Sequence, residues 1–195
     1  MDWYVLVIMM HLAGTILGVG GATFIEINLT KALADGKVDR VEGGFLKSTF
    51  TVVRVGLLLT LISGALILVH AVAENNGSLL LGENLWAKIT IIGILTVNAL
   101  LLQAHLINLY WGSALSFVSW WGAAVIGTLS SRGVYADYWA IIAVYLAALV
   151  IGAWVLHQIR TLVTAHAQAA ATESAHEQSP PDTAKDPPSD HSEHH

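Results

Sequence analysis

The hydrophobic positions of this chain fall into five long runs separated by polar segments. Each run holds about 20 apolar residues, enough at about 1.5 Å per residue to cross a hydrocarbon core of about 30 Å. The pattern predicts transmembrane helices over residues 3–29, 50–72, 85–109, 113–130 and 138–161. We therefore expect an all-α membrane protein, a bundle of about five transmembrane helices.

The composition agrees with a chain that lies mostly in lipid. Of its 195 residues, 55% are hydrophobic and 12% are charged, and the mean hydropathy is +0.63, whereas soluble domains carry about a quarter charged residues. Residues 1–164 are expected to form the five-helix transmembrane domain. Residues 165–195 form an expected disordered, His-containing cytoplasmic tail, because they show no apolar periodicity. With no cysteine, the chain has no disulfide, thiolate metal site or covalent c-type haem.

Charge is distributed unevenly between the two longest polar connections. Glu74 and Glu83 dominate the second, whereas the first gathers cations, namely Lys31, Lys37, Arg40, Lys47 and Arg54. Because cytoplasmic loops carry the excess of Lys and Arg, we expect the first connection in the cytoplasm, the N-terminus outside and the C-terminus cytoplasmic. The expected localisation is the inner (plasma) membrane, as a multi-pass protein. The lipid bilayer is then its main partner, and no nucleic-acid partner is expected.

Four of the five predicted helices carry a histidine inside or at the edge of the apolar core. His11 lies in the first helix, His70 at the end of the second, His105 in the third and His157 in the fifth. Ionisable side chains inside a membrane are costly, so they are functional candidates by default. Given the expected helix directions, His105 and His157 match in depth near the cytoplasmic face. His11 and His70 match more loosely near the outer face.

Two histidines at one depth on neighbouring helices can bind opposite faces of one iron, which is how b-type haem is held without covalent attachment. All four histidines are thus expected haem-iron ligands, and the pattern predicts one or two haem b groups. The expected function is transmembrane electron transfer or haem-linked redox chemistry by a membrane oxidoreductase, with a quinone or a redox protein as partner. The alternative is that each histidine only hydrogen-bonds a neighbouring helix.

Three charged residues stand near the ends of the predicted helices. Lys88 lies at the outer start of the third helix and Arg54 at the inner start of the second. Each either extends to the interface or pairs with an anion such as a haem propionate or a lipid phosphate. Glu26, near the inner end of the first helix, is expected to pair with a nearby cation rather than to relay protons. Hydrolase and kinase functions have no support, because no catalytic triad, phosphate loop, nucleotide fingerprint or carboxylate dyad is present.

Short motifs in the first three predicted helices carry a family resemblance. They are His11 followed by Gly18-Val-Gly-Gly21, Arg54 ahead of Ser63-Gly64, and Leu85-Trp-Ala-Lys88. Together they resemble the copper-resistance D and HemJ-type (protoporphyrinogen oxidase-like) integral membrane protein superfamily, over slightly more than half of the chain. In the HemJ-type enzymes a histidine in the first helix and a lysine early in the third are functional. The resemblance therefore implies haem or porphyrin chemistry at His11 and Lys88, whereas His157 and the last two helices do not follow the HemJ pattern.

Two functions of other classes stay open. In a copper or small-solute transport or assembly protein the histidines would line a path, because imidazole suits copper. In an accessory membrane subunit, or a homo-oligomer, they would only pack against other side chains. An absorbance spectrum of the purified protein distinguishes the haem hypothesis from both.

Overall fold

The protein is built from helices that run back and forth along one direction. The computed structural model describes residues 2–35, 40–75, 82–134 and 136–177, with the backbone alone at 33–35, 40–42, 171 and 174–177. Its helices are α1 (Trp3–Asp35), α2 (Arg40–Ala73), α4 (Glu83–Gln103), α5 (Leu109–Ser131) and α6 (Tyr138–Glu177). Within these ranges there is no strand, and all five helices are long and apolar enough to cross a membrane. The predicted all-helical class with five membrane-length helices is confirmed.

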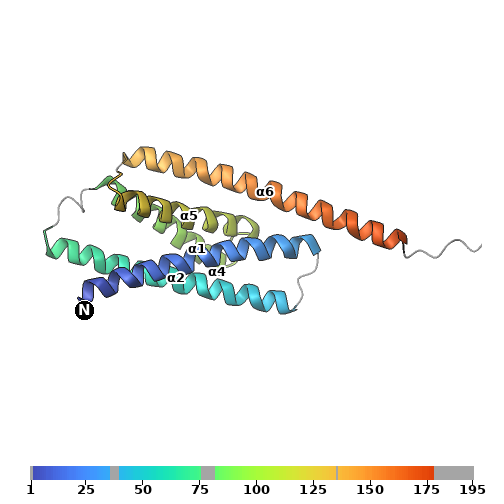
Figure 1. Ribbon diagram of the computed structural model, residues 1–195, viewed down its shortest axis with the longest axis horizontal. Coiled ribbons are helices and arrows are strands. Elements are labelled where there is room, and N and C mark those ends of the chain that lie inside the picture. The colour runs from blue at the N-terminus through green and yellow to red at the C-terminus, as the bar shows by residue number, and fades with distance from the viewer. Residues whose placement is uncertain (1, 36–39, 76–81, 135, 178–195) are drawn as a thin grey trace, which may run out of the picture.

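Successive helices are antiparallel, so the bundle has two distinct ends (Figure 1). At the first end, α1 begins beside the end of α2, and the ring of Tyr4 contacts that of His70. The starts of α4 and α6 meet at this end too, where the Tyr138 backbone N–H donates to the Glu83 carboxylate. At the second end, α1 finishes near α6, and Glu26 contacts Arg160.

Small residues bring α1 and α2 into close contact. A Cβ on Gly14 would lie 2.6 Å from Thr60 Oγ1, and one on Gly56 would lie 2.8 Å from the Gly18 backbone nitrogen. These distances are too short for any side chain, so glycine is what permits the backbones to approach. Antiparallel pairs along the seam are His11 with Ser63, Gly14 with Thr60, Gly18 with Gly56, and Gly21 with Val53.

At the centre of the bundle, the indole ring of Trp120 packs directly against Gly18. A Cβ on Gly18 of α1 would stand 2.3 Å from the Trp120 ring of α5. Trp120 is 1% exposed and belongs to a buried cluster with Ala22, Leu57 and Leu95, from α1, α2 and α4. Four helices therefore meet at this level.

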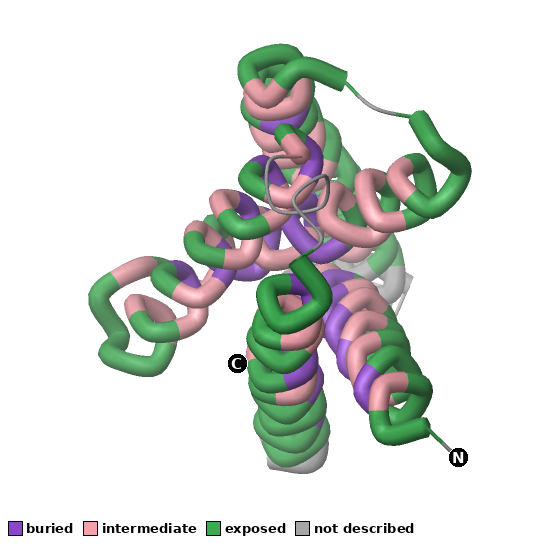
Figure 2. Tube along the Cα trace, turned by 90° about the vertical axis from the view of Figure 1, so that its left-hand side faces the viewer, coloured by how far each residue is buried: buried purple, intermediate pink, exposed green. Residues whose placement is uncertain are grey.

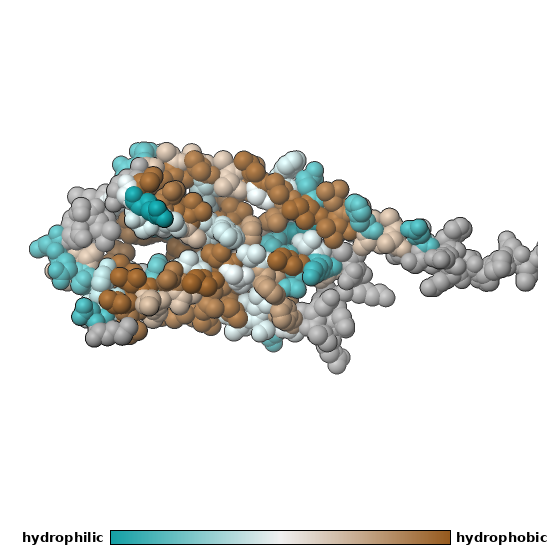
Figure 3. All heavy atoms as spheres, viewed as in Figure 1, coloured by the Kyte–Doolittle hydropathy of each residue, from teal (hydrophilic) through white to brown (hydrophobic). Residues whose placement is uncertain are grey.

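Away from that centre the helices expose apolar side chains. Buried residues gather along the inner faces of the helices, whereas the outer faces are exposed (Figure 2). Hydrophobic atoms form a broad band between two more hydrophilic ends (Figure 3). Soluble monomers rarely expose a patch of this extent, and a lipid bilayer is the medium that covers it.

The junction between α4 and α5 differs from the prediction. The third helix was expected to continue to residue 109, but α4 ends at Gln103, and His105 lies in the following turn with a φ of 55°. The Leu106 N–H bonds the Leu101 carbonyl and the His105 N–H bonds the Leu102 carbonyl, which is the Schellman pattern of a helix C-terminus. Asn108 then caps α5, its side chain accepting from the Tyr110 N–H.

The other helices are longer than expected at the second end. α1 continues to Asp35 and α2 begins at Arg40, so Arg54 lies well inside α2 and not at its start. α6 continues to Glu177, so residues 165–177, expected to be disordered, are helical. This segment is rich in alanine, the strongest helix former, and needs no apolar face to be helical. The rest of the expected tail, 178–195, lies outside the described residues.

Candidate functional site

His11 sits on the α1 face that packs against α2. Its Nδ1 lies 3.0 Å from the Ser63 hydroxyl oxygen, and its Cε1 would be 3.7 Å from a Cβ on Gly64. Ser63 is fully buried at 0% exposure, and its hydroxyl donates to the Leu59 carbonyl at 2.5 Å, the bond that serine commonly forms one helical turn back. The imidazole is thus held by α2 beside a position without a side chain.

The proton count at Ser63 decides the state of the histidine. A hydroxyl carries one hydrogen, and that of Ser63 is directed to a backbone carbonyl, which can only accept. The Ser63 oxygen is therefore the acceptor for His11, and we assign the ring proton to Nδ1. A neutral ring with this proton carries its lone pair on Nε2. This is the form in which a histidine binds a metal or accepts a proton.

Lys88 supplies a positive charge that acts on this ring electrostatically. It lies on α4, one turn from the helix start, and is half-buried. Its ammonium group is close enough to His11 for an electrostatic interaction. Within the described part of the chain Lys88 has no hydrogen bond or ion pair of its own. The fold thus brings together the two positions that the family resemblance singled out, from helices far apart in the sequence.

His70 is not brought to the same place as His11. Its ring packs on that of Tyr4, with centroids 4.1 Å apart, and meets that of Trp3 edge-on at 5.2 Å. Tyr4 precedes His11 by seven residues, which is about 10 Å along the helix axis. Two imidazoles on opposite faces of one iron must lie at one depth. The structure therefore does not juxtapose these two histidines, and His70 belongs to an aromatic cluster at the first end.

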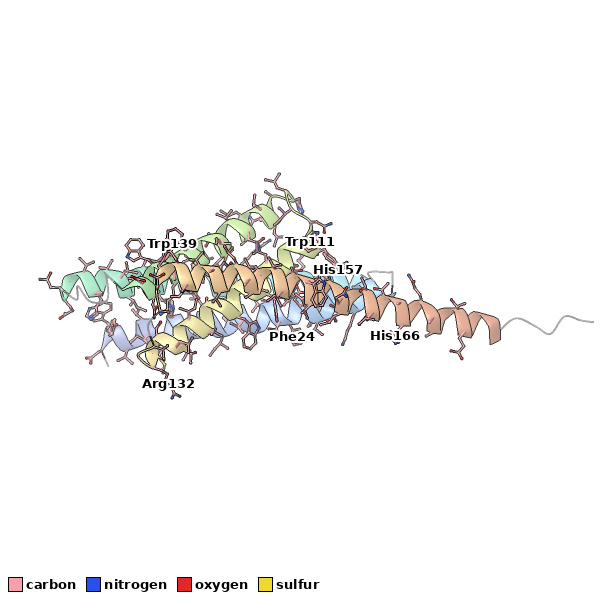
Figure 4. All side chains as sticks on the ribbon, turned by 90° about the horizontal axis from the view of Figure 1, so that it is seen from above. Phe24, Trp111, Arg132, Trp139, His157 and His166 are labelled. Carbon is pink, nitrogen blue, oxygen red and sulfur yellow. The ribbon has the colours of Figure 1, made fainter. Side chains whose placement is uncertain are left out.

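His105 and His157 lie in the second-end half of the bundle without touching each other. His105 is exposed in the turn after α4. His157 is exposed on α6, and its Nδ1 lies 2.7 Å from the Tyr110 hydroxyl of α5. Figure 4 shows His157 along α6, with His166 farther toward the C-terminal end of that helix. No hydrogen bond or ring contact joins His105 to His157 in the described ranges.

Arg54 is also remote from His11. Its exposed side chain borders a small cavity between α1, α2, α4 and α5, on the second-end side of Trp120. The predicted cofactor-binding residues are thus divided over the bundle, and His11 with Lys88 is the combination that the structure assembles. Among the described residues no group of three or more His, Cys, Asp and Glu side chains could hold a metal ion.

A second polar centre, around Arg160, was not predicted. Arg160 Nη2 donates to Glu26 Oε2 at 2.5 Å and to Ser113 Oγ at 3.1 Å. Its Nη1 donates to the Tyr110 carbonyl at 2.8 Å, and its guanidinium carbon lies 4.0 Å from the centre of the Tyr110 ring. The expected pairing of Glu26 with a cation is confirmed. The only signal in the sequence was an arginine late in an apolar run, with nothing to identify its partner.

The chain was compared with known proteins in three ways. No family model matches it, no curated protein matches it, and no solved structure matches it. The resemblance to the copper-resistance D and HemJ-type superfamily stays a prediction.

Proposed function

We propose that this chain is a membrane redox protein that binds a haem b or a related porphyrin at His11. The observation that supports the proposal is the hydrogen bond between His11 and Ser63. This bond leaves the Nε2 lone pair available. His11 lies in the membrane-spanning part of α1, where an ionisable side chain is costly and is therefore a functional candidate.

The residues present fit such a group. His11 and Lys88 are the residues that would hold it, the imidazole by binding its iron and the ammonium by pairing with a propionate carboxylate. Gly64 leaves the side of the imidazole next to α2 free of a side chain. When bound, the group supplies one-electron redox chemistry. Ser63 holds the tautomer of the ligand, as hydrogen-bond partners of ligating histidines generally do.

We further propose that the second end faces the cytoplasm. The exposed cations Lys31 and Lys47 lie at the second end, whereas the exposed carboxylates Glu74 and Glu83 lie at the first. The positive-inside rule then places the N-terminus outside and the end of α6 in the cytoplasm of a cell with an inner membrane. His11 would lie in the outer half of the bilayer, accessible to a lipid-soluble partner such as a quinone.

The test is an absorbance spectrum of protein expressed with ample haem. A reduced-minus-oxidised b-type spectrum is expected for the native chain and for His166→Ala, an exposed histidine in the C-terminal part of α6. His11→Ala should lose it, provided that the variant retains its helical content. Native protein without a haem spectrum would overturn the proposal.

The same measurement separates the remaining hypotheses. Ligation of a second haem by His105 and His157 stays a prediction, and loss of part of the spectrum in His105→Ala would support it. Copper bound by haem-free native protein, and lost in His11→Ala, would favour a copper transport or assembly role. Replacement of all four histidines without loss of stability or of any bound group would indicate an accessory subunit.

A further inference from the structure

Arg54 is a charged residue inside a membrane-length helix, and it has no partner in the described part of the chain. It lies within the candidate span Gly43–Ala73 of α2, and its side chain is exposed. Among the described residues it has no hydrogen bond, ion pair or ring contact. Hydrocarbon cannot solvate a guanidinium, so charged side chains in membrane spans pair with protein, water or lipid headgroups. The partner of Arg54 therefore comes from the surrounding medium.

The α4–α5 hairpin leaves the side of α2 that carries Arg54 uncovered. α4 ends at Gln103 and α5 begins at Leu109. Figure 1 shows these two helices turning back before the second-end limits of α1 and α2. α2 packs against α1 and hardly against α4. Lipid can therefore approach α2 beside the α4–α5 turn.

A cavity of about 30 Å³ lies at this place, and we call it the Arg54 cavity. Its wall includes Phe50 and Arg54 from α2, Leu102 from α4 and Ser116 from α5. Leu102 is the last residue but one of α4, so the cavity lies close to the end of that helix. A cavity needs about 10–15 Å³ to hold one water molecule, so this one has room for about two groups of that size. The two non-bridging oxygens of a phosphodiester are such groups.

Ser116 contributes a hydroxyl to the same wall. The Ser113 and Ser119 hydroxyls of α5 donate to carbonyls of their own helix. The Ser116 hydroxyl, in contrast, has no hydrogen bond within the described ranges, and the residue is half-buried. A guanidinium and a free hydroxyl can both donate to phosphate oxygens, and the guanidinium can donate two parallel bonds. The Arg54 cavity therefore has the donors that a phosphate group needs.

Lys47 places a second cation on the same side of α2. It precedes Arg54 by seven residues, which is about 10 Å along the helix axis and nearly the same face. Lys47 is exposed, and it lies farther toward the second end. Glu26, a carboxylate of the same half, is already paired with Arg160. The two cations on α2 therefore favour a headgroup with a net negative charge over a zwitterionic one.

We propose that the Arg54 cavity binds one anionic phospholipid from the second-end leaflet. Its phosphate accepts from Arg54 and Ser116, and its headgroup extends toward Lys47. One acyl chain lies along the exposed apolar face of α2, where Leu58 follows Arg54 by one turn and is 58% exposed. The apolar chains keep the phosphate at the membrane, which makes a lipid and not free phosphate the occupant. The proposal does not depend on a haem at His11.

The experiment is native mass spectrometry of the full chain in detergent, titrated with phosphatidylglycerol or with phosphatidylcholine of the same acyl chains. The native chain should retain one phosphatidylglycerol more tightly than phosphatidylcholine. Arg54→Gln should weaken phosphatidylglycerol binding at least about fivefold. Arg132→Gln is the matched control, because it removes an exposed arginine at the first end of α5 and should leave the affinity unchanged. Equal affinities for these two variants would refute the site, and Arg54 would then only reach interfacial water.

Two further measurements fix the position and the identity of the ligand. Ser116→Ala should lower the phosphatidylglycerol affinity severalfold, whereas Thr128→Ala, which removes an exposed hydroxyl of the same helix, should not. Native affinity in Ser116→Ala would contradict binding in the cavity. Inorganic phosphate in excess should leave the lipid bound, and its release would indicate a site for a free anion. Loss of haem but not of lipid in Arg54→Gln would identify a propionate as the partner and overturn the proposal.

Discussion

The two halves of the bundle differ in how many partners their ionisable side chains have. In the first-end half, His11 has one side-chain hydrogen bond and Lys88 has no ion pair among the described residues. In the second-end half, Arg160 contacts Glu26, Ser113 and both the carbonyl and the ring of Tyr110. Both groups lie within spans long and apolar enough for a membrane. The buried ionisable groups of the second-end half therefore have more side-chain and backbone partners than the half-buried ones of the first-end half.

This difference separates the proposed ligand site at His11 from a packing element at Arg160. The Arg160 guanidinium bonds to residues of α1 and α5 from α6 and so holds three helices together, and its removal should destabilise the whole fold. An imidazole with a free nitrogen beside an unpaired ammonium contributes little to folding but can bind a partner. Variants at the second end should thus alter stability, and variants at the first end should alter binding.

The largest effect is expected from Arg160→Met. It leaves the Glu26 carboxylate buried without a counter-ion, which costs about 3–5 kcal/mol when one partner of a buried pair is removed. The measurement is the free energy of unfolding in mixed detergent micelles. Arg132→Met is the matched control, because Arg132 is exposed at the end of α5 and projects from the bundle (Figure 4).

A double variant sharpens that result. Glu26→Leu combined with Arg160→Met removes both charges, and apolar replacement of a whole buried pair is often neutral. Most of the lost stability should therefore return. If the double variant is as unstable as Arg160→Met, the cost arises from lost packing around α6 and not from an uncompensated carboxylate.

A steric change at the centre should be the next largest. Gly18→Ala would place a Cβ 2.3 Å from the Trp120 ring, and overpacking of this kind costs about 1–3 kcal/mol. On the same helix, a Cβ on Gly20 meets nothing within 4 Å. Gly20→Ala should accordingly be stabilising by about 0.5–1 kcal/mol, because alanine loses less conformational freedom in a helix. Equal effects of the two alanines in unfolding experiments would contradict the observed packing.

At the first end the expected effect is on binding. Ser63→Ala removes the acceptor that fixes the His11 tautomer, and loss of such a partner weakens metal-group affinity about 10–100-fold. Haem titration followed by absorbance measures it. Thr51→Ala is the matched control on α2, because its hydroxyl also bonds one turn back, to the Lys47 carbonyl, but the residue is exposed. Equal haem affinities for the two variants would show that Ser63 is not part of the proposed ligand site.

The sequence predicted the helices well because each helix corresponds to one long, continuous run of apolar residues. Runs of about 20 apolar residues are visible without any knowledge of their neighbours. The end of α4 was missed for a local reason as well. A left-handed C-terminal residue is usually glycine, and here it is His105, with a φ of 55°. The apolar residues on both sides of the turn gave no sign of it.

The polar centres depend on contacts between distant residues, which spacing cannot reveal. The depth argument placed His11 and His70 together because both lie toward the first end, yet the antiparallel seam pairs His11 with Ser63 and His70 with Tyr4. Glu26 was expected to have a cationic partner, but only the packing of α6 on α1 identifies Arg160. The resemblance named His11 and Lys88 together, and their role stays a prediction.

The smallest expected effect on stability is that of a substitution at His105, which lies in the second-end half. His105→Gly relieves a left-handed backbone conformation that side chains disfavour by about 1–2 kcal/mol, offset in part by the greater freedom of unfolded glycine. A net gain below about 1 kcal/mol should follow. Asn75→Gly is the control, because Asn75 has a φ of 51° after α2 and carries no imidazole. Thermal unfolding in detergent compares the two.

The same pair of variants also tests whether His105 binds haem. If His105 serves only as the left-handed residue in the turn after α4, both glycine variants should be slightly stabilised and should keep the full haem spectrum. If it is an inner ligand, His105→Gly alone should lose part of that spectrum, although its backbone is relieved as in Asn75→Gly. A stabilised protein with a diminished spectrum would thus restore a ligand to the second end, and the contrast between the two halves would no longer hold.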